Sequence, residues 1–210
     1  MAATRPTTAI RTRRRADMDS SGESKVPDRS NPAPVAAQGD VWVFAYGSLM
    51  WNPGFVPAAN VAARLHGWCR SMCVLSTIYR GTDVCPGLVL GLDRGGSCLG
   101  RALRVRGVDW AVIKARLDER ELPTGVYLPR FLSVRLEDGQ MVPAYAYVVD
   151  RDHWQYWRGE HDDAIRLLRQ GHGRGGSARD YLANAVTHLT EMGIRRSSLH
   201  RLLRQVDGKA

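Results

Sequence analysis

Tyr46-Gly47-Ser48-Leu49 is the first segment whose residue types suggest chemistry. Its glycine allows a ligand to approach the backbone closely. Successive backbone amides at such a turn can point into one cavity and hold an anion or a developing oxyanion. An ordinary turn after a strand has the same composition, so the tetrapeptide alone leaves both interpretations open.

Glu121 is the second candidate, as a group that could accept and return a proton. In the helix predicted to end there, Ile113, Leu117 and Glu121 are spaced four apart and share one stripe. The apolar pair should face the core and turn the carboxylate inward. Burial and the last helical turn both raise the pKa of a carboxyl group, which favours proton transfer near neutral pH. Alternatively, this side chain reaches water or pairs with Arg120 or Arg130.

A third segment, residues 171–177, is rich in glycine but does not match a phosphate-binding loop. It lacks G-x-x-x-x-G-K-[ST] and follows no convincing strand, so we expect a flexible connection between helices. Ser177 or Asp180 would then cap the following helix. Neither H-E-x-x-H nor G-x-S-x-G is present, so the sequence supports neither a zinc protease nor a serine hydrolase.

The elements that position these residues are strands in the first two thirds of the chain and mainly helices in the last. Residues 41–46 are apolar throughout, which predicts a strand buried on both faces. A hairpin turn is expected at residues 137–140, and Asp109 should cap the helix that Pro123 stops. This order favours an α+β fold with a mostly antiparallel sheet or barrel. Strands are predicted at residues 41–46, 70–78, 87–92, 98–105, 131–136 and 142–149, and helices at 109–121, 160–170, 178–192 and 198–206.

Composition narrows the classes of protein. The chain has 210 residues and a net charge of +9, but the excess of arginine and lysine is spread along the chain. Nucleic-acid-binding surfaces usually concentrate their cations, so we expect no nucleic-acid partner. The chain contains no apolar run of about 18 residues, so we also expect no membrane association. Residues 1–40 have almost no large apolar side chains and predict a disordered basic extension, with the folded domain over 41–206.

The cysteine pattern indicates reduced thiols. None of the intervals between the cysteines gives C-x-x-C or the spacing of a zinc finger. We therefore expect a cytoplasmic protein with free thiols and no metal site. The four cysteines are Cys69, Cys73, Cys85 and Cys98.

Residues 43–55, V-F-A-Y-G-S-L-M-W-N-P-G-F, resemble the V-F-G-Y-G-S-L-[IM]-W-x-P-G-F opening of the ChaC family. That family comprises glutathione-specific γ-glutamylcyclotransferases. Further matching motifs follow in the family's order, and together they cover roughly residues 41–206. They are Y-R-G-T at 79–82, P-G-L-V-L-G-L at 86–92, R-E-L at 120–122, T-G-V-Y at 124–127 and R-D-Y-L at 179–182.

The resemblance implies a γ-glutamylcyclotransferase-like mixed β-barrel with flanking helices, without a metal or an organic cofactor. It assigns proton transfer to Glu121, in the R-E motif. Ala45 stands where the family usually has glycine, and its methyl group would narrow the pocket if that backbone lies against the substrate. The implied substrate-holding residues are Val43, Phe44, Ala45, Tyr46, Gly47, Ser48 and Leu49.

Aromatic and basic residues would complete the pocket. We expect Tyr127 and Tyr181 in its walls, although Tyr181 can equally pack on the sheet as a helix residue. Arg70 and Arg80 are candidates to meet a glycyl carboxylate, and surface salt bridges are the simpler alternative.

The expected function is a lyase that converts glutathione to 5-oxoproline and Cys-Gly by attack of the γ-glutamyl α-amine on its own γ-carbonyl. Its partner would be a small molecule, either glutathione or another γ-glutamyl peptide. Two alternatives remain: a cyclotransferase for other γ-glutamyl amines or peptides, and a non-catalytic ligand-binding or regulatory module.

Overall fold

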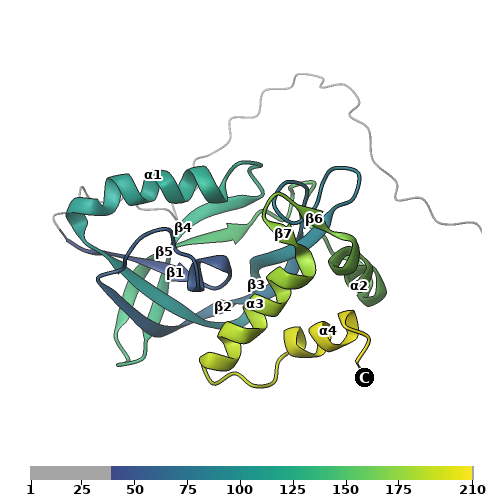
Figure 1. Cartoon of the computed structure of the whole chain (residues 1–210). Helices are drawn as coiled ribbons and strands as arrows, with labels where there is room; N and C mark the ends of the chain where they lie inside the picture. Colours follow the sequence, from purple (N-terminus) through teal and green to yellow (C-terminus); the bar gives the residue numbers. More distant parts are fainter. Residues whose placement is uncertain (1–38, 210) are drawn as a thin grey trace, which may run out of the picture. The chain divides into compact units, whose positions relative to one another are not determined.

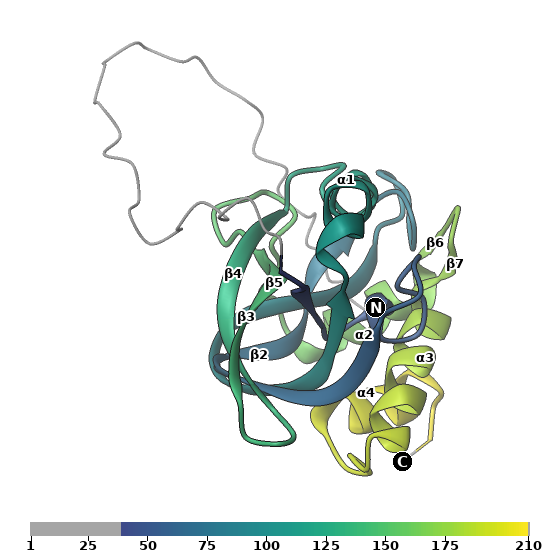
Figure 2. The ribbon, with the colours of Figure 1, turned by 90° about the vertical axis from the view of Figure 1, so that its left-hand side faces the viewer.

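The computed structural model describes residues 39–209, so the extension predicted over residues 1–40 lies outside the described residues except for its last two positions. Five strands form a closed barrel in the order β1-β3-β2-β4-β5 (Figures 1 and 2). All neighbouring pairs are antiparallel except β1 and β5, whose parallel pairing closes the barrel. The predicted α+β barrel is confirmed. The strands are β1 (Val41–Ala45), β2 (Ala59–Ser76), β3 (Gly87–Val105), β4 (Tyr127–Leu136) and β5 (Met141–Val149).

Helices flank the barrel on two sides. One of them, α1 (Trp110–Glu121), joins β3 to β4 and lies along the upper edge in Figure 1. The remaining helices follow β5, and a small hairpin of β6 and β7 connects α2 to α3. These C-terminal elements are α2 (His161–Gln170), β6 (His172–Gly173), β7 (Gly176–Ser177), α3 (Ala178–Glu191) and α4 (Ser198–Val206).

The side chains of β1 pack on both faces of the strand, as its uninterrupted apolar sequence predicted. Val43 and Ala45 belong to a core cluster that contains Trp110 and Leu117 of α1. Phe44, which points to the opposite face, belongs to a larger cluster with the leucines of α2, α3 and α4. The loop that follows β1 therefore starts from a strand fixed on both sides.

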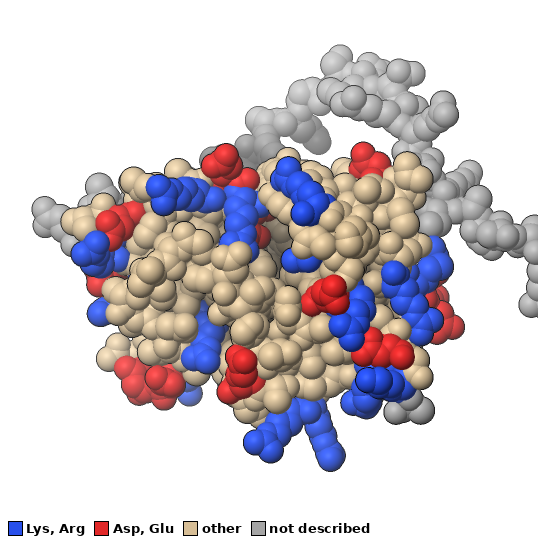
Figure 3. Space-filling model, in the orientation of Figure 1, with Lys and Arg blue, Asp and Glu red and all other residues tan. Residues whose placement is uncertain are grey.

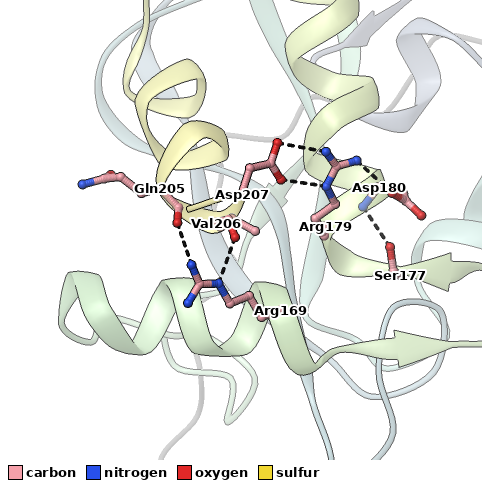
Figure 4. A network of polar contacts seen from close by, with 7 residues as sticks. All are labelled: Arg169, Ser177, Arg179, Asp180, Gln205, Val206 and Asp207. Carbon is pink, nitrogen blue, oxygen red and sulfur yellow. Dashed lines mark hydrogen bonds and ion pairs between the residues drawn. The ribbon is translucent and has the colours of Figure 1, made fainter. Parts of the chain in front are cut away.

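Polar contacts hold the three C-terminal helices together (Figure 4). Arg169 of α2 donates to the carbonyl oxygens of Gln205 and Val206 at the end of α4. Both carboxylate oxygens of Asp207 lie 3.0 Å from nitrogens of Arg179 in α3. The leucine faces of these helices and their polar ends thus support the same arrangement.

Two predicted strands, 87–92 and 98–105, are parts of the single strand β3. Gly95 and Gly96, which lie between the two predicted strands, have positive φ at an irregularity near Gly67 within continuous pairing to β2. β2 likewise begins eleven residues earlier than predicted, at Ala59 rather than residue 70. In this earlier part, the buried side chains of Ala63 and Leu65 alternate with the exposed side chains of Arg64 and His66, as in a half-buried strand.

Two local predictions were wrong. Asp109 makes no side-chain cap to α1, because its carboxylate pairs with Arg106 at 2.7 Å instead. Residues 171–177 form the β6–β7 hairpin rather than a flexible connection. In contrast, the hairpin turn at residues 137–140 is confirmed, and Ser177 caps α3 by accepting from the amide of Asp180.

All four cysteines are free, as predicted, and Cys73 and Cys98 are buried. Within residues 39–209, no helix combines the length and the apolar character needed to span a membrane.

Candidate active site

Glu121 is the last residue of α1 and lies in the wall of a cavity, with 18% of its side chain exposed. One turn earlier, Leu117 is 3% exposed and anchors this stripe of the helix in the core, so the predicted inward orientation is confirmed. Burial raises the pKa of Glu121, and the neighbouring guanidinium of Arg120 opposes that rise without cancelling it. The pKa of this carboxyl group therefore lies above that of an ordinary glutamate. This direction favours a group that must accept a proton and return it.

Arg120 ties the end of α1 to the loop after β1. Its Nε lies 3.1 Å from Oε1 of Glu121, so the pairing considered as an alternative is also present. Its Nη2 donates to the hydroxyl of Ser48 at 2.8 Å, and its Nη1 donates to the carbonyl of Asn52 at 2.6 Å. One arginine thus fixes the distance between the carboxyl group and the loop.

The loop itself, residues 46–49, is held from behind by buried groups. The hydroxyl of Tyr46 donates to the carbonyl of Tyr147 at 2.9 Å, and Arg70 donates to the carbonyl of Tyr46. A Cβ atom on Gly47 would lie 3.1 Å from the hydroxyl oxygen of Tyr181, which is closer than ordinary van der Waals contact. Glycine at this position lets α3 approach the loop.

The loop and Glu121 face a small inner pocket of about 30 Å³. Burial raises the pKa of Tyr46 and of Tyr127, and the nearby Glu121 adds to the rise in both. These phenols remain neutral in the physiological range and surround the carboxyl group without supplying a countercharge. The inner pocket is lined by Tyr46, Gly47, Ser48, Leu49, Leu90, Glu121, Tyr127, Tyr147 and Tyr181.

An outer cavity of about 400 Å³ adjoins the inner pocket and shares Ser48, Glu121, Tyr127 and Tyr181 with it. This volume falls in the range of about 300–1,000 Å³ that is usual for small-molecule sites. On the face shown in Figure 3, a hollow opens between the end of α1 and the β6–β7 hairpin, with basic side chains beside it. The inner pocket is therefore the deep end of a cavity large enough for a small peptide.

The mouth of the cavity is formed by residues 76–80, which lead out of β2. The β6–β7 hairpin supports this segment, since the amides of Arg174 and Gly175 donate to the carbonyls of Ile78 and Tyr79 at 3.1 and 2.8 Å. The glycine-rich segment that sequence reasoning treated as a connection therefore shapes the cavity.

Three of the predicted substrate-holding residues lie elsewhere. Val43, Phe44 and Ala45 are 0% exposed and line neither part of the cavity. The methyl group of Ala45 packs in the core cluster beneath α1, so it does not narrow the pocket. These residues fix the strand from which the loop projects.

The other predicted residues meet at the cavity. Tyr46, Gly47, Ser48 and Leu49 line the inner pocket, and Tyr127 and Tyr181 line both parts together with Glu121.

Arg70 and Arg80 have different surroundings. Arg70 donates to the carbonyls of Tyr46 and Leu99 and does not line the cavity, whereas Arg80 does. Arg70 therefore supports the loop from behind, and of the two arginines Arg80 alone faces the space available to a ligand.

Sequence reasoning did not single out several residues of the wall. Trp51 packs against Tyr181 with ring centroids 5.9 Å apart. Gln155 is 3% exposed and its Nε2 donates to the carbonyl of Leu75 at 2.7 Å. Trp51 lies inside the opening segment that resembles the ChaC family, which was a usable signal, but nothing in the sequence near Gln155 indicated the cavity. Among residues 39–209, no cluster of three or more His, Cys, Asp or Glu side chains is suited to a metal ion.

Comparison with known families identifies this arrangement. The family described as ChaC-like protein matches residues 41–209, which include every residue of the cavity wall. The chain belongs to the ChaC-like family.

Curated relatives of this ChaC-like chain carry one activity in their names. A protein of Escherichia coli K12 named glutathione-specific gamma-glutamylcyclotransferase is 34% identical over 167 residues, which cover 79% of this chain and 72% of that protein. Mouse glutathione-specific gamma-glutamylcyclotransferase 1 is 34% identical over 142 residues, which cover 62% of this chain and 64% of the mouse protein. The chain thus matches slightly less than two thirds of the mouse relative.

Solved structures confirm the fold. The structure of a yeast gamma-glutamylcyclotransferase specific to glutathione superposes with a TM-score of 0.73 and 20% sequence identity, covering 81% of this chain and 96% of that one. A γ-glutamylcyclotransferase-like barrel with flanking helices is therefore the architecture of this chain.

Proposed function

We propose that this protein is a glutathione-specific γ-glutamylcyclotransferase, a lyase that releases 5-oxoproline and Cys-Gly. The observation that carries the proposal is that a buried carboxyl group, Glu121, and the loop over residues 46–49 face the same small pocket. The names of the E. coli and mouse relatives support glutathione as the substrate. The free thiols support a cytoplasmic location.

The reaction needs little beyond positioning and proton transfer. The α-amine of the γ-glutamyl group attacks its own γ-carbonyl carbon, the C–N bond to cysteine breaks, and a five-membered lactam forms. Nucleophile and electrophile belong to one molecule, so the cavity has only to hold the folded conformer. The outer cavity of about 400 Å³ has room for that conformer, with its reacting atoms beside Glu121.

Glu121 would move the proton. The α-ammonium must lose a proton before attack, and the leaving nitrogen must gain one. A single carboxyl group can perform both steps in sequence, and burial, which raises its pKa, makes it a stronger base than an ordinary glutamate. Backbone amides of residues 46–49 would hold the glutamyl group and the oxyanion, for which one donor typically contributes about 2.7–4 kcal/mol.

The decisive experiment incubates the pure protein with glutathione and measures 5-oxoproline and Cys-Gly. Glu121→Gln should retain the fold and glutathione binding and lose about 10²–10⁴-fold in turnover. Glu119→Gln, an exposed change on the same helix, is the matched control and should keep full activity. Full activity of a folded Glu121→Gln protein would remove Glu121 from the mechanism.

The alternative substrate class is tested in the same assay. γ-Glutamyl-alanine presents the same γ-glutamyl group without the cysteinyl-glycine portion. If it is converted faster than glutathione, the protein is a cyclotransferase for other γ-glutamyl amines. If neither compound yields 5-oxoproline, the protein is not a cyclotransferase for these substrates and a binding role takes precedence.

A further inference from the structure

Arg80 is a half-buried cation at the mouth of the cavity. Among the described residues, the carbonyl oxygen of Gly175 is the acceptor for its guanidinium group, and no carboxylate forms an ion pair with it. The carboxylate of Asp180 acts on the charge of Arg80 from a distance. It is exposed, and its Oδ1 lies 3.1 Å from Nη1 of Arg179. A guanidinium group carries five N–H donors, so most of this one's capacity is left for a ligand.

The β6–β7 turn positions this guanidinium group. A Cβ on Gly176 would lie 3.0 Å from Nη1 of Arg80, and Gly176 has a φ of +98°. Its guanidinium carbon also lies 5.5 Å from the centroid of the Tyr181 ring, which lines both parts of the cavity. The arginine is thus held between a glycine turn and an aromatic side chain of the cavity wall.

The two arginines that line the cavity are not equivalent. Arg120 already contacts Ser48, Asn52 and Glu121, so its positive charge is directed to the inner pocket. Glu121 is the sole acidic residue among the described residues of the wall. The cation that remains for a second anionic group of a ligand is Arg80.

We propose that Arg80 binds the C-terminal carboxylate of the substrate and thereby selects γ-glutamyl peptides that end in a free carboxylate. This inference rests on the proposed function. With the γ-glutamyl group beside Glu121, the remaining dipeptide extends into the outer cavity, whose wall contains Arg80. A guanidinium–carboxylate contact is directional and charge-assisted, so it discriminates against the neutral amide of the same shape.

The test compares glutathione with its C-terminal amide, which removes the negative charge and leaves the γ-glutamyl bond unchanged. Binding of both compounds is measured by calorimetry in the Glu121→Gln protein, where substrate is not consumed. We expect glutathione to bind about 10- to 100-fold more tightly than the amide, and we expect kcat/KM of the wild type to show the same preference. Adding Arg80→Gln should bring the ratio close to one by weakening glutathione alone.

A structural role for Arg80 would give a different result, since it would weaken both compounds equally. Arg158→Gln removes one exposed arginine that does not line the cavity and should keep the preference. Should Arg80→Gln fail to fold, Arg80→Lys retains the charge but not the fork of donors, and is expected to reduce the preference without abolishing it.

Equal affinity of the Arg80-containing protein for glutathione and its amide would overturn the inference even if 5-oxoproline is released. Conversely, a carboxylate preference without 5-oxoproline would retain the role of Arg80 and reject the proposed reaction.

Discussion

The two ends of the cavity are built differently. Side chains fixed by hydrogen bonds to the barrel and α1 bound the deep end, whereas a loop and a two-stranded hairpin bound the mouth. Tyr127 illustrates the first, since its hydroxyl donates to the carbonyl of Leu90 inside β3 at 2.6 Å. Tyr79 illustrates the second, because it is 37% exposed. Proton transfer needs fixed geometry, while recognition of the rest of a ligand tolerates more movement. Changes at the deep end should therefore lower kcat, and changes at the mouth should alter KM and substrate preference.

After Glu121→Gln, Arg120→Gln should give the largest effect at the deep end. It removes the hydrogen bonds to Ser48 and Asn52, and we expect kcat/KM for glutathione to fall by about 10- to 100-fold at neutral pH. The positive charge of Arg120 lowers the pKa of Glu121, so its removal raises that pKa further. The carboxylate is the base, so the acid limb of the pH–rate profile should move to higher pH.

Arg120→Gln should leave the substrate preference unchanged. The preference for glutathione over its C-terminal amide should persist, because that property belongs to the mouth. Arg116→Gln, an exposed change on the same helix, serves as the control for loss of one positive charge. An acid limb at the wild-type position in Arg120→Gln would show that this arginine does not tune Glu121.

Sequence periodicity predicted the inward orientation of Glu121, and the resemblance to the ChaC family assigned this residue and residues 46–49 to the site. The spacing of Ile113, Leu117 and Glu121 determines which way the carboxylate points once the helix packs, and the apolar run over residues 41–46 determines where β1 ends. These local patterns place the carboxyl group and the loop, and the barrel then brings them together.

The outer cavity was not predictable in the same way, because its wall is made by contacts between distant segments. Gln155 meets Leu75 across 80 positions of the chain, and no local pattern indicates that meeting. Arg70 and Arg80 look alike in the sequence, and only the path of β2 places the first behind the loop and the second in the cavity. The glycines of residues 171–177 suggested flexibility, but the amides of Arg174 and Gly175 bind the carbonyls of Ile78 and Tyr79 and hold the segment in place.

Asp118→Asn tests how firmly α1 is fixed to the barrel. Oδ1 of Asp118 accepts hydrogen bonds from the hydroxyls of Tyr145 and Tyr147 at 2.8 and 2.7 Å, and Oδ2 lies 2.5 Å from Nζ of Lys114. Loss of the carboxylate should lower the free energy of unfolding by about 1.5–3 kcal/mol. Because Glu121 is three residues further along, kcat should also fall several-fold while the preference for a free carboxylate stays.

The pH dependence of stability gives an independent measurement of Asp118. Partial burial disfavours its ionisation, but hydrogen bonds from Lys114, Tyr147 and Tyr145 outweigh burial and hold its pKa below the ordinary value of 3.8. A depressed pKa stabilises the fold above pH 3.8, and the stabilisation is lost as pH falls through the folded pKa. Urea unfolding should therefore show a wild-type advantage over Asp118→Asn at neutral pH that disappears in acid. An advantage that persists at the lowest pH would mean that packing, not charge, is the cause.

The smallest effect is expected at the start of α3, which supports the mouth. The hydroxyl of Ser177 accepts from the amide of Asp180 at 2.9 Å (Figure 4). The next residue, Tyr181, lies under the guanidinium group of Arg80. Removing this cap by Ser177→Ala should cost about 1 kcal/mol of stability, measured as a shift in the urea midpoint at unchanged slope. The loosened helix start displaces the turn that holds Arg80 more than it displaces Glu121, which α1 and the barrel fix separately. KM for glutathione should therefore rise about two- to threefold while kcat stays the same, and a fall in kcat with KM unchanged would show that the two ends of the cavity are not independent.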